Sequence, residues 1–211
     1  MNRAASFDPY RSMVGASRYD AEFERLRTVH GDDPATRAQA AAHEAGHAVM
    51  AASFGWRLTG IRLQRHTSGK WHGFVNFEHP QANQALQVHE NPELVLASVV
   101  TMLGGRAAEQ RVGRYHPCGS IGELLYARDI CAQMDEWAGL EQGRTLALAE
   151  EATAARLQTH VAAFDLLRTH LARTSKLLPT ERRRMLQAVT PTPIELPFPI
   201  KKKLAAKATR A

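Results

Sequence analysis

The chain has 211 residues, of which 44% are hydrophobic and 23% charged, with a formal net charge of +6. This length allows one domain with a substantial core. No stretch is long and apolar enough to span a bilayer, and the polar N-terminus MNRAASFDPYRS lacks the apolar segment of a signal peptide. The two cysteines form neither a metal-ligand pattern nor a disulfide framework. We therefore expect a cytoplasmic protein.

Most of the positive charge lies in the C-terminal segment 191–211. Five basic residues against one acidic residue give this segment +4, which leaves +2 for the rest of the chain. That remainder is too weak an electrostatic signal for a nucleic-acid interface. The segment also contains four prolines and is expected to be a flexible, solvated tail, with docking or membrane-surface binding as the alternative.

The first half of the chain predicts a helix followed by a β-hairpin. Residues 1–32 are expected to be a loose N-terminal extension with a short helix at 19–29. Asp33-Pro34 is a helix-start signal and opens the predicted domain, 33–190. An alanine-rich helix follows over 36–53. Two alternating segments then predict strands at 58–65 and 71–78, joined by a turn at Ser68-Gly69.

The second half of the chain predicts helices throughout. Asn91-Pro92 begins the first of them, and its apolar residues fall on one face. Ser120 is placed to cap a helix that runs to about residue 137. A long helix is expected over 144–171, and a short one over 180–188. The predicted fold is therefore mainly α with a small β-hairpin.

The stretch AAHEAGHAV lies within the predicted helix 36–53. Residues four apart share a helix face, so His43 and His47 can bind one metal ion. Glu44 lies beside that face, where it can deprotonate a metal-bound water instead of coordinating the metal. This arrangement is the HExxH pattern of zinc hydrolases. Gly46 costs about 1 kcal/mol in a helix relative to alanine, which indicates a close approach by another element.

Three segments together resemble the peptidase domain of the FtsH-type membrane zinc proteases. The segment 43–48, HEAGHA, is similar to the active-site helix of that family, and 102–109, MLGGRAAE, is similar to its LGGRAAE helix. The segment 119–127, GSIGELLYA, is similar to its GAxNDLxxA stretch. The resemblance implies a zincin-like metallopeptidase domain in which the second helix packs beside the zinc site. It covers about residues 36–186.

The third metal ligand is the point at which this chain departs from the family pattern. The aspartate of the family's stretch is its third zinc ligand, and Glu123 occupies that position here. Glutamate also binds zinc, but its extra methylene requires a local shift. Alternatively, Ser120 and Glu123 form a capping box. Glu109 and Asp129 are fallback ligands, although Glu109 is expected to pair with Arg106 and Asp129 to face solvent.

The hairpin is also similar to a family strand that runs along the substrate. An extended peptide could bind the edge of strand 71–78 through main-chain hydrogen bonds, although an ordinary hairpin that covers the core fits equally well. Three histidines flank this region without ligand spacing and are expected to lie at the surface: His66, His72 and His79.

These observations predict a zinc metalloendopeptidase. His43, His47 and Glu123 would bind Zn²⁺ and Glu44 would act as general base on peptide or unfolded protein substrates. The 211 residues contain no GxxxxGK[ST] loop, so the chain is not expected to unfold stable proteins itself, and a separate ATPase or adaptor would have to unfold them. The alternative is a catalytically inactive relative that serves as a binding or scaffold module with a structural metal.

Overall fold

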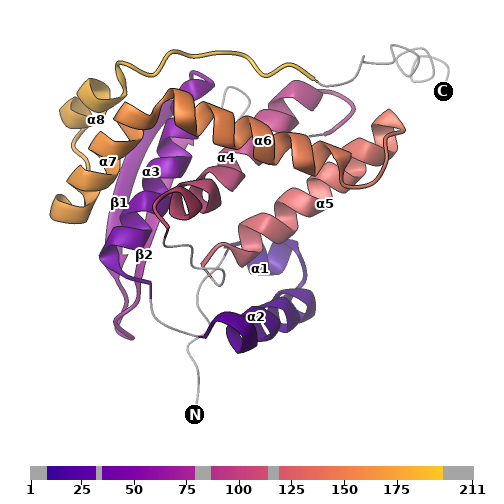
Figure 1. The fold of residues 1–211 in the computed structure, drawn as a ribbon, viewed down its shortest axis with the longest axis horizontal. Coiled ribbons are helices and arrows are strands. Elements are labelled where there is room, and N and C mark those ends of the chain that lie inside the picture. Colours follow the sequence, from indigo (N-terminus) through magenta and orange to yellow (C-terminus); the bar gives the residue numbers. More distant parts are fainter. Residues whose placement is uncertain (1–8, 32–34, 79–86, 114–118, 197–211) are drawn as a thin grey trace.

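A computed structural model describes residues 9–31, 35–78, 87–113 and 119–196 of the chain. This part of the protein is mainly helical and contains one two-stranded antiparallel sheet, as the sequence predicted (Figure 1). The elements in chain order are α1 (Pro9–Met13), α2 (Ala16–His30), α3 (Arg37–Ser53), β1 (Arg57–Arg65), β2 (Trp71–Glu78), α4 (Pro92–Arg111), α5 (Ile121–Ala138), α6 (Arg144–Thr159), α7 (Val161–Thr174) and α8 (Pro179–Leu186).

Helix α3 is the centre of the main core. It contacts α4, α6, α7 and both strands, and most of its residues are buried. Its first turn is fixed by a capping box: the Thr36 hydroxyl accepts from the Gln39 N–H, and the Gln39 side chain accepts from the Thr36 N–H. The helix predicted over 36–53 is confirmed to within one residue, because it spans Arg37–Ser53 with Thr36 as its N-cap; the start signal at Asp33-Pro34 lies outside the described residues.

The predicted hairpin is confirmed. The register of β1 and β2 runs from Arg57 opposite Glu78 to Arg65 opposite Trp71, with an irregularity after Leu58. The other edge of β1 is also used. The Leu63 N–H donates to the Ser175 carbonyl, and the segment after α7 forms an antiparallel bridge with β1 at Arg62. Both edges of β1 are thus paired, so β2 is the outer strand of the described hairpin.

The helices of the second half confirm the predicted start of α4 and the predicted position of α5. The single helix predicted over 144–171 is wrong, because the chain turns at His160 and forms α6 and α7 instead. The turn has a packing reason: α6 lies mainly on α4, whereas α7 lies on α3. The last helix begins at Pro179 rather than at Thr180, and it ends at Leu186.

Both ends of the described chain contact the domain. The N-terminal extension contains the predicted helix, which is longer than expected, and a second short helix, α1; both pack on α5. At the other end, residues 191–196 follow an irregular path beside α3. The Thr192 N–H donates to the Ser53 carbonyl, and Arg156 donates to the carbonyls of Thr192 and Pro193. The rest of the predicted tail, 197–211, lies outside the described residues.

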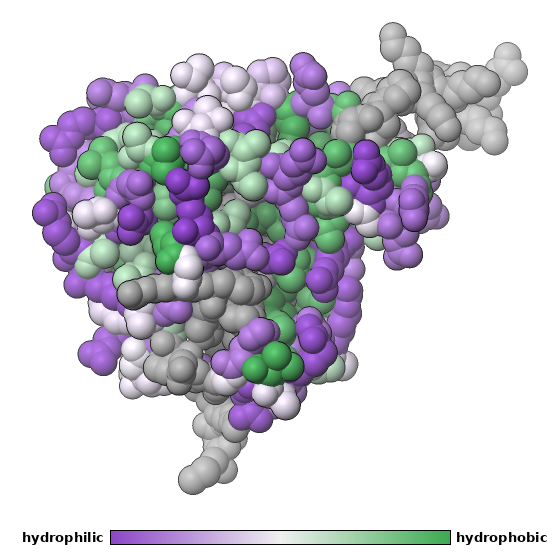
Figure 2. Space-filling view, viewed as in Figure 1, coloured by the Kyte–Doolittle hydropathy of each residue, from purple (hydrophilic) through white to green (hydrophobic). Residues whose placement is uncertain are grey.

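The surface is of mixed polarity on the face that Figure 2 shows, where hydrophilic and hydrophobic residues intermingle. The large hydrophobic side chains that are exposed lie on several different elements: Met13, Val29, Phe74, Leu166 and Leu178. Within the described ranges, no helix has the combination of length and apolar character that a membrane crossing requires.

Candidate metal centre

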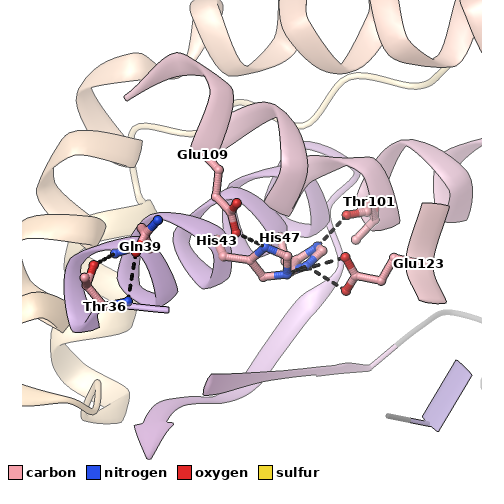
Figure 3. A network of polar contacts seen from close by, with 7 residues as sticks. All are labelled: Thr36, Gln39, His43, His47, Thr101, Glu109 and Glu123. Atoms are coloured by element: carbon pink, nitrogen blue, oxygen red, sulfur yellow. Dashed lines mark hydrogen bonds and ion pairs between the residues drawn. The ribbon is translucent and has the colours of Figure 1, made fainter. Parts of the chain in front are cut away.

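The two histidines of α3 point to one position beside α4. His43 and His47 lie one turn apart on the same face of the helix, and their side chains are 12% and 10% exposed. Their Nε2 atoms are 2.9 Å apart (Figure 3). The helical spacing of four residues therefore produces the convergence that the sequence predicted.

Partners on α4 fix the orientation of both imidazoles. His43 Nδ1 lies 2.8 Å from Glu109 Oε1, and His47 Nδ1 lies 2.8 Å from the Thr101 carbonyl oxygen. A carbonyl and a carboxylate only accept hydrogen bonds, so each Nδ1 carries the proton. When the rings are neutral, as metal binding requires, each presents its Nε2 lone pair to the shared position. This is the arrangement by which proteins orient histidines that bind metals.

Glu123 completes a group of three candidate ligands. It lies in the first turn of α5, with one carboxylate oxygen 3.0 Å from His47 Nε2 and the other 3.4 Å from His43 Nε2. All three ligand atoms lie within 4.8 Å of one another, and the group could hold a metal ion. Ligand atoms about 2.0–2.1 Å from a tetrahedral zinc ion are about 3.3 Å apart, which is close to these separations.

The capping-box alternative for Glu123 is wrong. Ser120 is the N-cap of α5, but its side chain makes no capping hydrogen bond. Within the described part of the chain, its buried hydroxyl has no hydrogen-bond partner. Glu123 turns toward the histidines instead of back to the helix start, and its extra methylene is accommodated in this position.

Three glycines allow α3 and α4 to approach each other at the site. A Cβ atom on Gly46 would overlap the Gly104 carbonyl group and lie 2.6 Å from Ala108 Cβ. A Cβ atom on Gly105 would lie 2.6 Å from the Nε2 atoms of both His43 and His47. Gly46 is therefore required for helix packing, as expected. Gly105 is required because any side chain there would clash with both imidazoles.

Glu44 lies beside the histidines and is buried, at 6% exposure. It packs against β2, because a Cβ atom on Gly73 would lie 2.6 Å from the Glu44 carboxyl group. Burial raises the pKa of Glu44 above its ordinary value, although the two histidines oppose this shift. Of the candidate site residues, Glu44 is thus the one that meets the hairpin.

The charges of the three candidate ligands favour a cation between them. Burial lowers the pKa of both histidines, but the negative charge of Glu123 and their other carboxylate neighbours outweigh it. The pKa of His43 therefore lies well above its ordinary value, and that of His47 also lies above it. Burial raises the pKa of Glu123, yet the two imidazoles hold it well below its ordinary value.

The structure corrects the predicted role of Glu109. The expected pair between Arg106 and Glu109 is wrong: Arg106 lies 2.5 Å from Glu150 on α6, whereas Glu109 contacts His43. Glu109 therefore orients a candidate ligand. The four-residue spacing of Thr101, Gly105 and Glu109 places them on one face of α4, but the spacing alone does not indicate which helix that face contacts.

Asp129 and the two described histidines of the hairpin, His66 and His72, are not part of the centre. Asp129 pairs with Arg18 at the surface, as its predicted position implies. His66 is exposed and His72 is half-buried on the hairpin, while His79 lies outside the described residues. Asp129, His66 and His72, which the structure describes, do not join the group of three candidate ligands.

A scan against protein-family models gives no match, and a search of curated proteins gives none either. The evidence for function consequently comes from the residues and geometry of the site.

Proposed function

We propose that this protein is a zinc-dependent endopeptidase with a zincin-like domain that resembles the FtsH peptidase domain. One observation carries the proposal. The Nε2 lone pairs of His43 and His47 and the carboxylate of Glu123 converge on one position, and both Nδ1 protons are already used by other partners. With both rings neutral, three acceptors directed at one point repel each other, so a cation held between them stabilises the group.

The donor set fits zinc. Two imidazole nitrogens and one carboxylate are a ligand set of catalytic zinc, which leaves a fourth position for water or substrate. Gly105 lets both imidazoles lie directly against α4, which brings their Nε2 atoms to one place. When bound, zinc would supply the Lewis acidity that polarises a peptide carbonyl and acidifies water.

Glu44 is the proposed general base. Because it follows His43 directly on α3, it lies beside the ligand face and remains free of the ligand group. In peptide hydrolysis its carboxylate takes a proton from the attacking water and later delivers it to the leaving amine. Its position against Gly73 keeps this carboxylate next to the hairpin.

The hairpin supports a peptide substrate. β2 is the outer strand of the described hairpin, and it contacts Glu44 through Gly73. An extended peptide that adds to this edge would bind through main-chain hydrogen bonds with little dependence on its sequence. Peptides, unfolded segments or a dedicated protein are therefore the proposed substrates, and a separate ATPase or adaptor is the proposed source of unfolded chains.

Metal analysis tests the site. The purified protein is expected to retain about one zinc ion per chain, and His43→Ala is expected to lose it. His66→Ala is the matched control, because this exposed histidine lies outside the group of ligands. Absence of zinc from the wild type, or full retention by His43→Ala, would overturn the metal assignment.

Hydrolysis of an unfolded protein such as casein tests the chemistry. Glu44→Gln is expected to abolish hydrolysis while zinc stays bound, because the amide cannot accept the proton. Glu151→Gln, the same change at an exposed position, should retain activity. If a zinc-loaded wild type shows no hydrolysis above that of Glu44→Gln, the protein is the non-catalytic scaffold of the alternative interpretation.

A further inference from the structure

The turn of α5 that carries Glu123 lies between two different sets of contacts. Ile121 and Leu125 are 1% and 4% exposed, and together with Val14 and Tyr19 they form a hydrophobic cluster separate from the main core. Phe23, Leu26 and Tyr126 pack around it. The first turn of α5 is therefore packed against the N-terminal helices.

Glu123 lies on the opposite side of the same turn. At about 100° per residue, Glu123 is about 160° around the helix from both Ile121 and Leu125. One face of the turn thus contacts α1 and α2, while the other presents the carboxylate to His43 and His47. Figure 1 shows the two N-terminal helices beneath the end of α5 at which Glu123 lies.

The contacts of α1 and α2 are concentrated on α5. In the described part of the chain, α1 and α2 contact each other and otherwise make their main contacts with α5. Further along α5, the Tyr10 ring lies 5.6 Å from the Tyr126 ring, and Arg18 lies 2.7 Å from Asp129. The helices α1 and α2 are also linked by an ion pair between Arg11 and Asp20.

Among the described residues, no side chain caps the start of α5. The Ser120 side chain makes no capping hydrogen bond, and Glu123 does not return to the helix start. The packing of Ile121 and Leu125 on Val14 and Tyr19 therefore takes over the role that a capping box has elsewhere.

We propose that α1 and α2 position the third metal ligand, with Tyr19 as the principal positioning residue, and that metal binding and docking of these helices stabilise each other. The inference rests on the proposed zinc site. Coupling is reciprocal by thermodynamic necessity: if docking of α1 and α2 strengthens zinc binding, then zinc strengthens their docking by the same factor.

The test measures zinc affinity by competition with a chelator in full-length variants. Tyr19→Ala, which removes the buried ring from the cluster, is expected to weaken zinc binding about tenfold. Val29→Ala, at a 65% exposed position of the same helix, should not change it. Met185→Ala is matched for loss of a buried side chain on α8, away from the site, and should leave zinc affinity within about twofold.

Hydrogen exchange of the wild type tests the reciprocal effect and requires no variant. Zinc is expected to slow amide exchange in α2 as well as in the first turn of α5. This effect should disappear in Glu123→Ala. A role of α1 and α2 in stability alone would leave exchange in α2 insensitive to zinc.

The experiments distinguish failure of the positioning role from failure of the proposed function. If the wild type binds zinc, but Tyr19→Ala binds it equally well or zinc leaves α2 exchange unchanged, the positioning role is wrong and the zinc site stands. If the wild type binds no zinc, the proposed function is wrong and the positioning role falls with it.

Discussion

Helices α3 and α5 begin with the same kind of sequence but use it differently. Thr36 is followed three residues later by Gln39, and Ser120 is followed three residues later by Glu123. Both pairs match the capping-box pattern. At α3 the box forms in full, whereas at α5 the serine makes no capping bond and the glutamate joins the histidines, as Figure 3 shows for Gln39 and Glu123.

The difference shows that a residue placed to form a capping box can instead serve a candidate metal centre. An N-cap side chain typically contributes about 1 kcal/mol, and α5 forgoes this contribution. The helix start is held by long-range packing, and the carboxylate is available for a ligand role. Substitutions at the two helix starts should consequently have opposite consequences for metal binding and for stability.

The largest expected effect is on metal binding at α5. Glu123→Ala should weaken zinc binding more than about a hundredfold, because it removes a ligand rather than a residue that orients one. Gln39→Ala, the equivalent change at α3, should leave zinc affinity unchanged, and Asp129→Ala, which removes only the ion pair with Arg18, should weaken it far less than Glu123→Ala. Chelator competition measures all three. Equal zinc affinities for Glu123→Ala and the wild type would mean that Glu123, like Gln39, is not a metal ligand.

A smaller loss of affinity is expected at the residue that orients His43. Glu109→Gln keeps a hydrogen-bond acceptor for Nδ1 but removes its negative charge, so zinc affinity should fall about tenfold. Glu150→Gln is the matched change, at the carboxylate that pairs with Arg106 on α6. An unchanged affinity in Glu109→Gln would show that the helix packing alone orients the histidine.

At the start of α3, loss of the capping side chain is expected to lower the stability of the protein. Thr36→Ala removes the hydroxyl that accepts from the Gln39 N–H, and should lower the free energy of unfolding by about 1 kcal/mol. Zinc affinity should not change. Denaturant unfolding of the metal-free protein measures the first quantity. A loss of zinc binding in this variant would contradict the separation between the two helix starts.

The smallest effect is expected for the equivalent change at α5. Ser120→Ala removes a hydroxyl that makes no capping bond, so the free energy of unfolding should change by less than about 0.5 kcal/mol. The same denaturant unfolding experiment measures it beside Thr36→Ala. A loss as large as that of Thr36→Ala would show that Ser120 caps α5 in solution.

The residues that meet through local periodicity were predictable from the sequence. Four-residue spacing on a helix places His43 and His47 on the same face, and the close approach of another element at Gly46 follows from the cost of glycine in a helix. The strands of the hairpin alternate and end at a turn, so their bounds were also accessible.

The residues that meet through long-range packing were not. Glu109 has Arg106 three residues before it, and no local rule indicates that His43 takes the glutamate while Glu150 takes the arginine. The turn at His160 likewise depends on which helix each half packs against, since neither glycine nor proline marks it.

The two histidines differ in their vulnerability to genetic change. The partner of His43 is the side chain of Glu109, which one substitution removes. The partner of His47 is the main-chain carbonyl of Thr101, which every amino acid supplies. Variation at position 101 therefore leaves the anchor of His47 in place, whereas variation at position 109 adjusts the affinity of the centre without replacing a ligand. Natural or engineered tuning of the site should accumulate at Glu109.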